Sequence, residues 1–253
     1  MAKYYDRCWN PIFGCCGDFK GCGNCYAKSL MKRRGRQWND FGEMNVNRKQ
    51  LYRKFDETPQ LIAVCTQSDL FQTKKADHEW VVDAVLAKCN MNRNNHYLFL
   101  TKFSENMKKH FNEEGFMARI SRNHLEPFSF DDMAFGVSVC CKDDIHRIAD
   151  LITTSNIKHR FVAFEPLLED IEPSLSDDQL KKMEWIIIGA ETGDNPTLCK
   201  QDWMIRIVER ADRLGIPVFV NAVHTEEGKV TTEFDEMDER LRRSDIPFAI
   251  KKV

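Results

Sequence analysis

Residues 13–27 read FGCCGDFKGCGNCYA, and the rest of the chain is organised around this stretch. Four of the ten cysteines fall within it, interleaved with four glycines. A buried cysteine usually packs as a small apolar residue, but Gly, Asp, Lys and Asn neighbours favour irregular backbone. A helix-like run, Tyr26 to Arg34, follows directly. We therefore expect a loop at residues 13–27 that is folded around a bound group, such as a metal.

The spacing of the cysteines narrows the kind of metal site. Cys15, Cys22 and Cys25 form C-x6-C-x2-C, and thiolates select zinc, copper(I) or iron-sulfur clusters. A structural zinc site usually takes a second pair of ligands from another segment. Cys140 and Cys141 do not form such a pair, because adjacent side chains on a strand point to opposite faces. Three thiolates therefore predict a metal centre with one open coordination position.

Other cysteines leave an alternative open. Cys8, Cys16 and Cys140 lie near the expected site in sequence or topology, and any of them could supply a fourth ligand. A fourth protein ligand would close the open position on which substrate or cofactor binding depends. The alternative function is then a non-catalytic zinc or iron-sulfur module that binds nucleic acid or a protein partner.

Composition bounds the class of protein. The chain has 253 residues and a formal net charge of −2, so no overall basic field would recruit nucleic acid. Residues 1–6 lack the apolar core of a signal peptide, and no apolar run approaches the roughly 20 residues of a membrane span. We expect a cytoplasmic protein without membrane contact, whose reduced cysteines are ligands or core residues.

The chain alternates strand-like and helix-like segments. Strands are predicted at 61–66, 96–101, 134–139, 160–165, 185–189 and 217–221, and helices at 80–87, 104–111, 143–153, 176–183 and 202–214. Ser104 is a plausible N-cap, and residues 112–132 are expected to be an irregular insertion. Apolar strands separated by helices indicate a parallel sheet. With a possible short strand before Trp9, the pattern predicts one α/β domain, residues 1–253, folded as a full or partial TIM-type barrel; a doubly wound open sheet is the alternative.

Polar residues follow the predicted strands one after another. Both candidate folds place the functional face at the carboxyl ends of the strands. Strand ends also turn polar simply because they meet solvent, so the set as a whole, rather than any one member, predicts a site. The set comprises Ser68, Asp69, Thr101, Lys102, Ser138, Glu165, Glu191, Asn221 and His224.

Several segments resemble a known family. Trp9-Asn10-Pro11, Gly14-Cys15 and the run GCGNCYA at 21–27 are similar to the WNPxxGC…GCxNCYA opening of a three-cysteine family common in bacteriophage genomes and related to radical S-adenosylmethionine (SAM) enzymes. Further similar segments follow in the same order across residues 8–222: QSDLF at 67–71, LTK at 100–102, GVSV at 136–139, EPLL at 165–168 and GAETG at 189–193. The first gap between cysteines is three residues longer than in the commonest radical-SAM motif, C-x3-C-x2-C.

The resemblance implies a cofactor set. Cys15, Cys22 and Cys25 would ligate three irons of a 4Fe-4S cluster, and SAM would occupy the fourth iron. Reduction would then release a 5′-deoxyadenosyl radical, and the protein would position the target hydrogen and exclude water. Asp69 and Glu191 are the candidate catalytic carboxylates.

The remaining predicted site residues are expected to bind SAM. Lys102 would neutralise a carboxylate, and Ser138 and Glu165 would hydrogen-bond the ribose or the amino group. Tyr26 or Phe13 would pack near the adenine.

The substrate implied by the resemblance is a modified nucleobase in phage DNA. One possibility is isomerisation of an amino-acid adduct on thymine, and repair of a base lesion is the alternative. A base in a duplex would have to be flipped out to reach the site. We expect an electron donor such as flavodoxin or ferredoxin. The run Lys32 to Arg36 could contact DNA or could be a solvated helix end.

Overall fold

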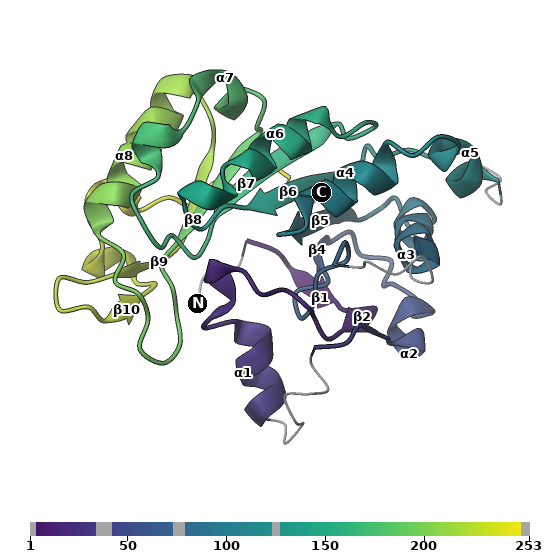
Figure 1. The fold of residues 1–253 in the computed structure, drawn as a ribbon, viewed down its shortest axis with the longest axis horizontal. Coiled ribbons are helices and arrows are strands. Elements are labelled where there is room, and N and C mark those ends of the chain that lie inside the picture. The colour runs from purple at the N-terminus through teal and green to yellow at the C-terminus, as the bar shows by residue number, and fades with distance from the viewer. Residues whose placement is uncertain (1–3, 34–41, 73–78, 123–126, 249–253) are drawn as a thin grey trace.

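An eight-stranded sheet forms the centre of the computed structural model, which describes residues 4–33, 42–72, 79–122 and 127–248 (Figure 1). The first seven strands are parallel, and β10 is antiparallel to β9. The order across the sheet is β1 (Arg7–Trp9), β4 (Leu61–Val64), β5 (His96–Thr101), β6 (Met133–Ser138), β7 (His159–Phe164), β8 (Trp185–Gly189), β9 (Val218–His224) and β10 (Val230–Thr231). A separate antiparallel pair joins β2 (Ile12–Phe13) and β3 (Asn45–Val46).

The order of the strands in the sheet follows their order in the chain. A doubly wound sheet reverses its strand order at a switch point, so that alternative is wrong. A closed barrel is not observed either, because β1 and β10 are the two edges and no pairing between them occurs in the described part of the chain. The fold is an open, mostly parallel α/β sheet.

Helices cover one side of this sheet, except α1, which lies apart from the others and packs against the cysteine loop (Figure 1). The helices are α1 (Tyr26–Arg33), α2 (Arg48–Leu51), α3 (Glu79–Asn90), α4 (Ser104–Phe111), α5 (Phe116–Ser121), α6 (His146–Thr153), α7 (Asp177–Leu180) and α8 (Gln201–Leu214), with short 3-10 turns η1 (Lys20–Cys22), η4 (Lys142–Asp144), η5 (Glu172–Ser174), η6 (Phe234–Glu236) and η7 (Glu239–Leu241). None of the helices in these ranges is long and apolar enough to cross a bilayer.

Alternation along the strands divides the core into two layers. Val162, Ile186 and Val220 belong to the large cluster that includes the helices. Their neighbours on the opposite face, such as Phe161 and Ile187, form a smaller cluster. Because both faces of the strands are buried, the strands are apolar throughout, which is why the sequence predicts them well.

The predicted elements are confirmed with shifted ends, and two details are wrong. The expected irregular insertion, residues 112–132, contains α5, with residues 123–126 outside the described part. Phe116 and Ile120 lie one turn apart on α5 and are both buried, and Phe116 packs on Phe111 with ring centroids 5.1 Å apart. Ser104 is not the N-cap of α4, because Phe103 holds that position and Ser104 Oγ donates to Asp150 Oδ2 at 2.8 Å.

Candidate functional site

A cavity of about 480 Å³ lies at the carboxyl ends of the parallel strands. Its walls come from the cysteine loop, residues 13–27, and from the segments that follow β4, β5, β7 and β8. All nine predicted site residues line it: Cys15, Cys22, Cys25, Tyr26, Asp69, Lys102, Ser138, Glu165 and Glu191. Of the other predicted strand-end residues, Ser68, Thr101 and Asn221 also line it, whereas His224 does not and accepts the Cys199 N–H at 2.9 Å.

The three predicted ligand cysteines line this cavity, and the sulfurs of Cys15 and Cys22 both lie close to Gly17. A Cβ atom at Gly17 would be 3.4 Å from Cys15 Sγ and 3.6 Å from Cys22 Sγ, so glycine leaves room between the two thiols. The Gly17 N–H donates to Cys15 Sγ at 3.4 Å. Burial raises the pKa of Cys15 to about 12, so the metal-free thiol is protonated at neutral pH. Cys25 is half-buried on the same wall.

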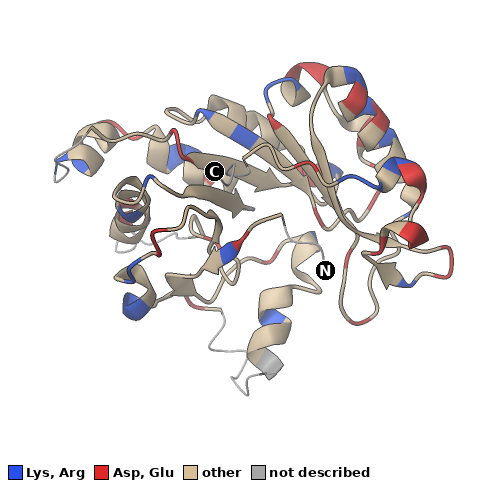
Figure 2. Ribbon diagram, turned by 180° about the vertical axis from the view of Figure 1, so that it is seen from behind, with Lys and Arg blue, Asp and Glu red and all other residues tan. Residues whose placement is uncertain are grey.

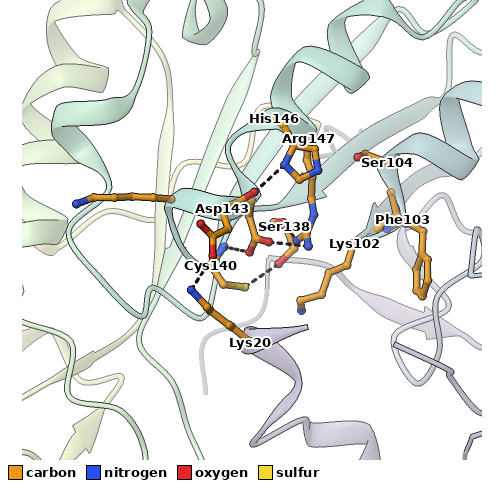
Figure 3. A network of polar contacts seen from close by, with 12 residues as sticks. Lys20, Lys102, Phe103, Ser104, Ser138, Cys140, Asp143, His146 and Arg147 are labelled. Carbon is orange, nitrogen blue, oxygen red and sulfur yellow. Dashed lines mark hydrogen bonds and ion pairs between the residues drawn. The ribbon is translucent and has the colours of Figure 1, made fainter. Parts of the chain in front are cut away.

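Lys102 is the cation that lines the cavity beside the thiols in the described part of the chain. Lys102 makes no ion pair within the described residues, and its side chain extends towards the segment that carries Lys20 (Figure 3). Burial alone would lower the pKa of Lys102, but the negative charges of the Cys140, Cys22 and Cys25 thiolates and of Asp69 raise it above its usual value. A lysine that makes no direct ion pair in the described residues fits a site that receives an anionic group.

The thiol groups of the cavity were expected to hold a metal. No three His, Cys, Asp or Glu side chains in the described ranges are grouped closely enough to hold one metal ion. In a 4Fe-4S cluster each thiolate binds a separate iron, so its ligands need not converge on one point. Cys15, Cys22 and Cys25 line one cavity together with Lys102, and a cluster held by the three cysteines stays a prediction.

Each possible fourth ligand has a different position. Cys8 lines the cavity. Cys16 is exposed, is not a lining residue and donates its thiol to the Gln72 carbonyl at 3.4 Å. Cys140 is buried behind Gly21, where a Cβ atom would be 2.3 Å from Cys140 Sγ. Cys8 is therefore the one of the three that shares the cavity with the predicted ligands.

Glu165 follows β7 and reaches the cavity beside Gly189. Burial raises the pKa of this carboxyl group, and a hydrogen bond from Asn221 Nδ2, 2.5 Å from Oε1, acts against that rise. Ser138 Oγ donates to the main-chain carbonyl of Glu165 at 2.9 Å, so the hydroxyl fixes the backbone rather than the carboxylate. The carboxylate is a half-buried acceptor with one protein donor in the described part of the chain.

Asp69 has the contacts of an anchor between strand ends. Its Oδ1 accepts from Thr101 Oγ1 at 2.7 Å and from the Phe71 N–H at 3.0 Å, and its Oδ2 accepts the Lys102 N–H at 2.8 Å. Burial raises the pKa of this carboxyl group, and the three donors oppose the rise. These contacts join the loop after β4 to the end of β5, and a catalytic role for Asp69 stays a prediction.

Glu191 and Tyr26 lie towards the edges of the cavity. Glu191 is buried and accepts the Thr197 N–H at 2.8 Å. Tyr26 is 58% exposed at the start of α1, so its ring is available at the rim. Between them, a Cβ atom at Gly193 would be 3.4 Å from Asn24 Cβ, which shows that the loop after β8 meets the cysteine loop.

Two buried residues that hold the cysteine loop were missed in the sequence. Gln72 contacts the backbone on both sides of Cys15 through its side-chain amide. Arg147 pairs with Asp144 at 2.6 Å, donates to the Ser138 carbonyl at 2.7 Å and lies 4.6 Å from the centre of the Phe19 ring (Figure 3). Neither belongs to a motif, and the sequence carries no local signal for either contact.

The charged residues of α8 are of both signs. Lys or Arg and Asp or Glu positions alternate along its ribbon (Figure 2), and its Arg206 and Arg210 are paired with Asp170 and Glu172. The basic run at 32–36, proposed as a DNA contact, has its side chains outside the described residues.

The fold and the cavity define an α/β protein with a thiol-lined candidate site at the carboxyl edge of its parallel sheet. The chain belongs to the family described as "Protein of unknown function (DUF5131)", whose model matches residues 1–241. No curated protein and no solved structure matches the chain.

Proposed function

We propose that this chain is a radical-SAM enzyme whose 4Fe-4S cluster is held by Cys15, Cys22 and Cys25. The observation that carries the proposal is that the three thiols line the same cavity as Lys102 and Glu165. We also interpret the open sheet as a partial (β/α) barrel. In such a barrel the parallel strands follow one another in chain order, as they do in this sheet.

The chain's own residues would bind and orient SAM. The cluster, when bound, would supply the electron that cleaves SAM to a 5′-deoxyadenosyl radical. Lys102, which makes no direct ion pair in the described residues, would hold the SAM carboxylate. The carboxylate of Glu165, fixed by Asn221, would accept hydrogen bonds from the amino group or the ribose. Tyr26 at the rim would cover the adenine.

We further propose that the substrate is a modified nucleobase in DNA, with isomerisation of an amino-acid adduct on thymine as the leading reaction and lesion repair as the alternative. The thiols lie inside a cavity, so a base in a duplex would have to be flipped out to reach a cluster held there. Flavodoxin or ferredoxin would supply electrons. Nucleoside mass spectrometry of DNA made with and without this protein tests the substrate, and identical base composition would contradict it.

The cluster is tested by iron and sulfide analysis after anaerobic reconstitution. The wild-type protein should bind about four irons, and Cys15→Ser, Cys22→Ser and Cys25→Ser should each lose most of them. Cys89→Ser is the matched control, because Cys89 is fully buried and does not line the cavity. A colourless protein that retains one zinc per chain, or iron binding that survives all three substitutions, would contradict the proposal.

A further inference from the structure

We propose that Gln72 determines which of two adjacent cysteines, Cys15 or Cys16, faces the cavity. The inference deepens the proposed function, since it names the residue that sets the first ligand of the proposed cluster. Gln72 acts here as a positioning residue and does not line the cavity.

The side-chain amide of Gln72 binds the backbone on both sides of Cys15. Its Nε2 donates to the Gly14 carbonyl at 2.8 Å, and its Oε1 accepts the Cys16 N–H at 2.8 Å. The side chain of Ser68 reinforces the arrangement, because its hydroxyl donates to the same carbonyl at 2.5 Å and accepts from Gln72 Nε2 at 2.7 Å. The peptide groups that flank Cys15 are therefore fixed from a segment more than fifty residues away.

The main chain of Gln72 holds the neighbouring thiol away from the cavity. Cys16 Sγ donates to the Gln72 carbonyl at 3.4 Å, and Cys16 is exposed, whereas Cys15 lines the cavity. Gly14 has a φ of +81°, a conformation that glycine adopts readily and that turns the chain just before the two cysteines. The turn at Gly14 and the contacts of the Gln72 amide together direct the Cys15 side chain towards the cavity and the Cys16 side chain away from it.

Because Gln72 is buried, exchanging the positions of Cys15 and Cys16 would be energetically costly. Gln72 is 1% exposed, so any shift that placed Cys16 in the cavity would leave buried amide groups without partners. The two thiols also differ in accessibility, because Cys16 is exposed and Cys15 is half-buried in the cavity wall. The ratio of Cys16 to Cys15 labelling therefore reports directly on which thiol faces outward.

The test is pulsed iodoacetamide labelling of metal-free protein, read residue by residue by peptide mass spectrometry. In the wild-type protein Cys16 should react at least tenfold faster than Cys15. Gln72→Glu keeps the size and the acceptor but loses the two donor contacts, and it should lower this ratio at least fivefold. Cys89, which is fully buried, serves as an internal reporter and should stay unlabelled.

Two further variants separate positioning from loss of stability. Asn95→Ala removes another amide that is 1% exposed but lies at the opposite end of β5, and its labelling ratio should stay within twofold of wild type. Ser68→Ala is a milder change to the same anchor and should lower the ratio at least twofold, which provides a result if Gln72→Glu unfolds and exposes Cys89. An unchanged ratio in Gln72→Glu with Cys89 protected, or in Ser68→Ala if Gln72→Glu unfolds, would overturn the inference.

The labelling needs no metal, so it separates this inference from the proposed function. If wild-type protein binds no iron but the ratio falls in Gln72→Glu, Gln72 still orients the cysteines and the cluster proposal fails. If iron binds but the ratio is unchanged, the cluster stands and the role of Gln72 is wrong.

Discussion

Gly189 lies against the carboxylate of Glu165, so closely that a Cβ atom at position 189 would be 2.6 Å from Glu165 Oε1. The last residue of β8 thus leaves room for the acid that follows the neighbouring strand β7. A larger residue at 189 would displace the carboxylate from Asn221 and from the cavity. The glycine is therefore part of the site, although it supplies no side chain.

Gly189→Ala should destabilise the protein by about 1–3 kcal/mol, the usual cost of overpacking a filled site. Urea denaturation of the metal-free protein measures the change. Gly23→Ala is the control, because the nearest atom to its added Cβ is 3.9 Å away. Equal stability of Gly189→Ala and wild type would show that Glu165 does not occupy the position described.

Glu165 should make the protein less stable as pH rises. Burial raises its pKa in the folded state above the ordinary value, so the folded protein binds this proton more tightly than the unfolded chain. The free energy of unfolding then falls as pH increases from the ordinary pKa through the folded one. Glu165→Gln should flatten this decline in urea titrations between pH 4 and 8.

Asp177→Asn provides the opposite case for the same titration. A hydrogen bond from Arg210 lowers the pKa of Asp177, so its contribution to stability is present above the ordinary pKa and is lost as pH falls. The substitution should therefore change the acidic side of the curve. If Glu165→Gln leaves the curve parallel to wild type, the burial of that carboxylate is wrong.

The fold was largely predictable because the strands are buried on both faces. β5 and β8 have the predicted bounds, and their apolar runs leave no other interpretation. Ser104 was misassigned as a cap because its hydroxyl donates a hydrogen bond to Asp150, forty-six residues later in the chain, instead of capping the helix. A long-range hydrogen bond that replaces a local cap cannot be predicted from the neighbouring sequence.

Some residues of the site could be predicted from the sequence, and others could not. Strand-end residues such as Lys102 and Glu191 could be predicted, because parallel strands bring their carboxyl ends to one edge. Gln72 and Arg147 could not, since their roles come from contacts with the cysteine loop that only the folded chain creates.

Lys102→Met should weaken SAM binding at least tenfold in the reconstituted protein. Hydrogen bonds to charged groups are worth about 1.5–3 kcal/mol, and no described Lys or Arg other than Lys102 lines the cavity. Isothermal titration calorimetry under anaerobic conditions measures the affinity. Lys20→Met is the control, because Lys20 is exposed and paired with Asp143. Wild-type affinity in Lys102→Met would remove the assigned role.

Arg147→Met should cost about 3–5 kcal/mol of stability, because it leaves the carboxylate of Asp144 buried without its partner. The double variant Asp144→Asn/Arg147→Met should recover part of that loss, since neither charge is then isolated. Chemical denaturation gives both values. Additive losses in the double variant would contradict the account of a coupled buried pair.

The central claim, that Cys15, Cys22 and Cys25 hold a cluster that reduces SAM, is tested most directly by product analysis. Anaerobically reconstituted protein, reduced with dithionite and incubated with SAM, should release 5′-deoxyadenosine and methionine in equal amounts. Cys22→Ala should release neither while its circular dichroism matches that of wild type. Absence of 5′-deoxyadenosine from a wild-type protein that carries its full iron complement would contradict the account.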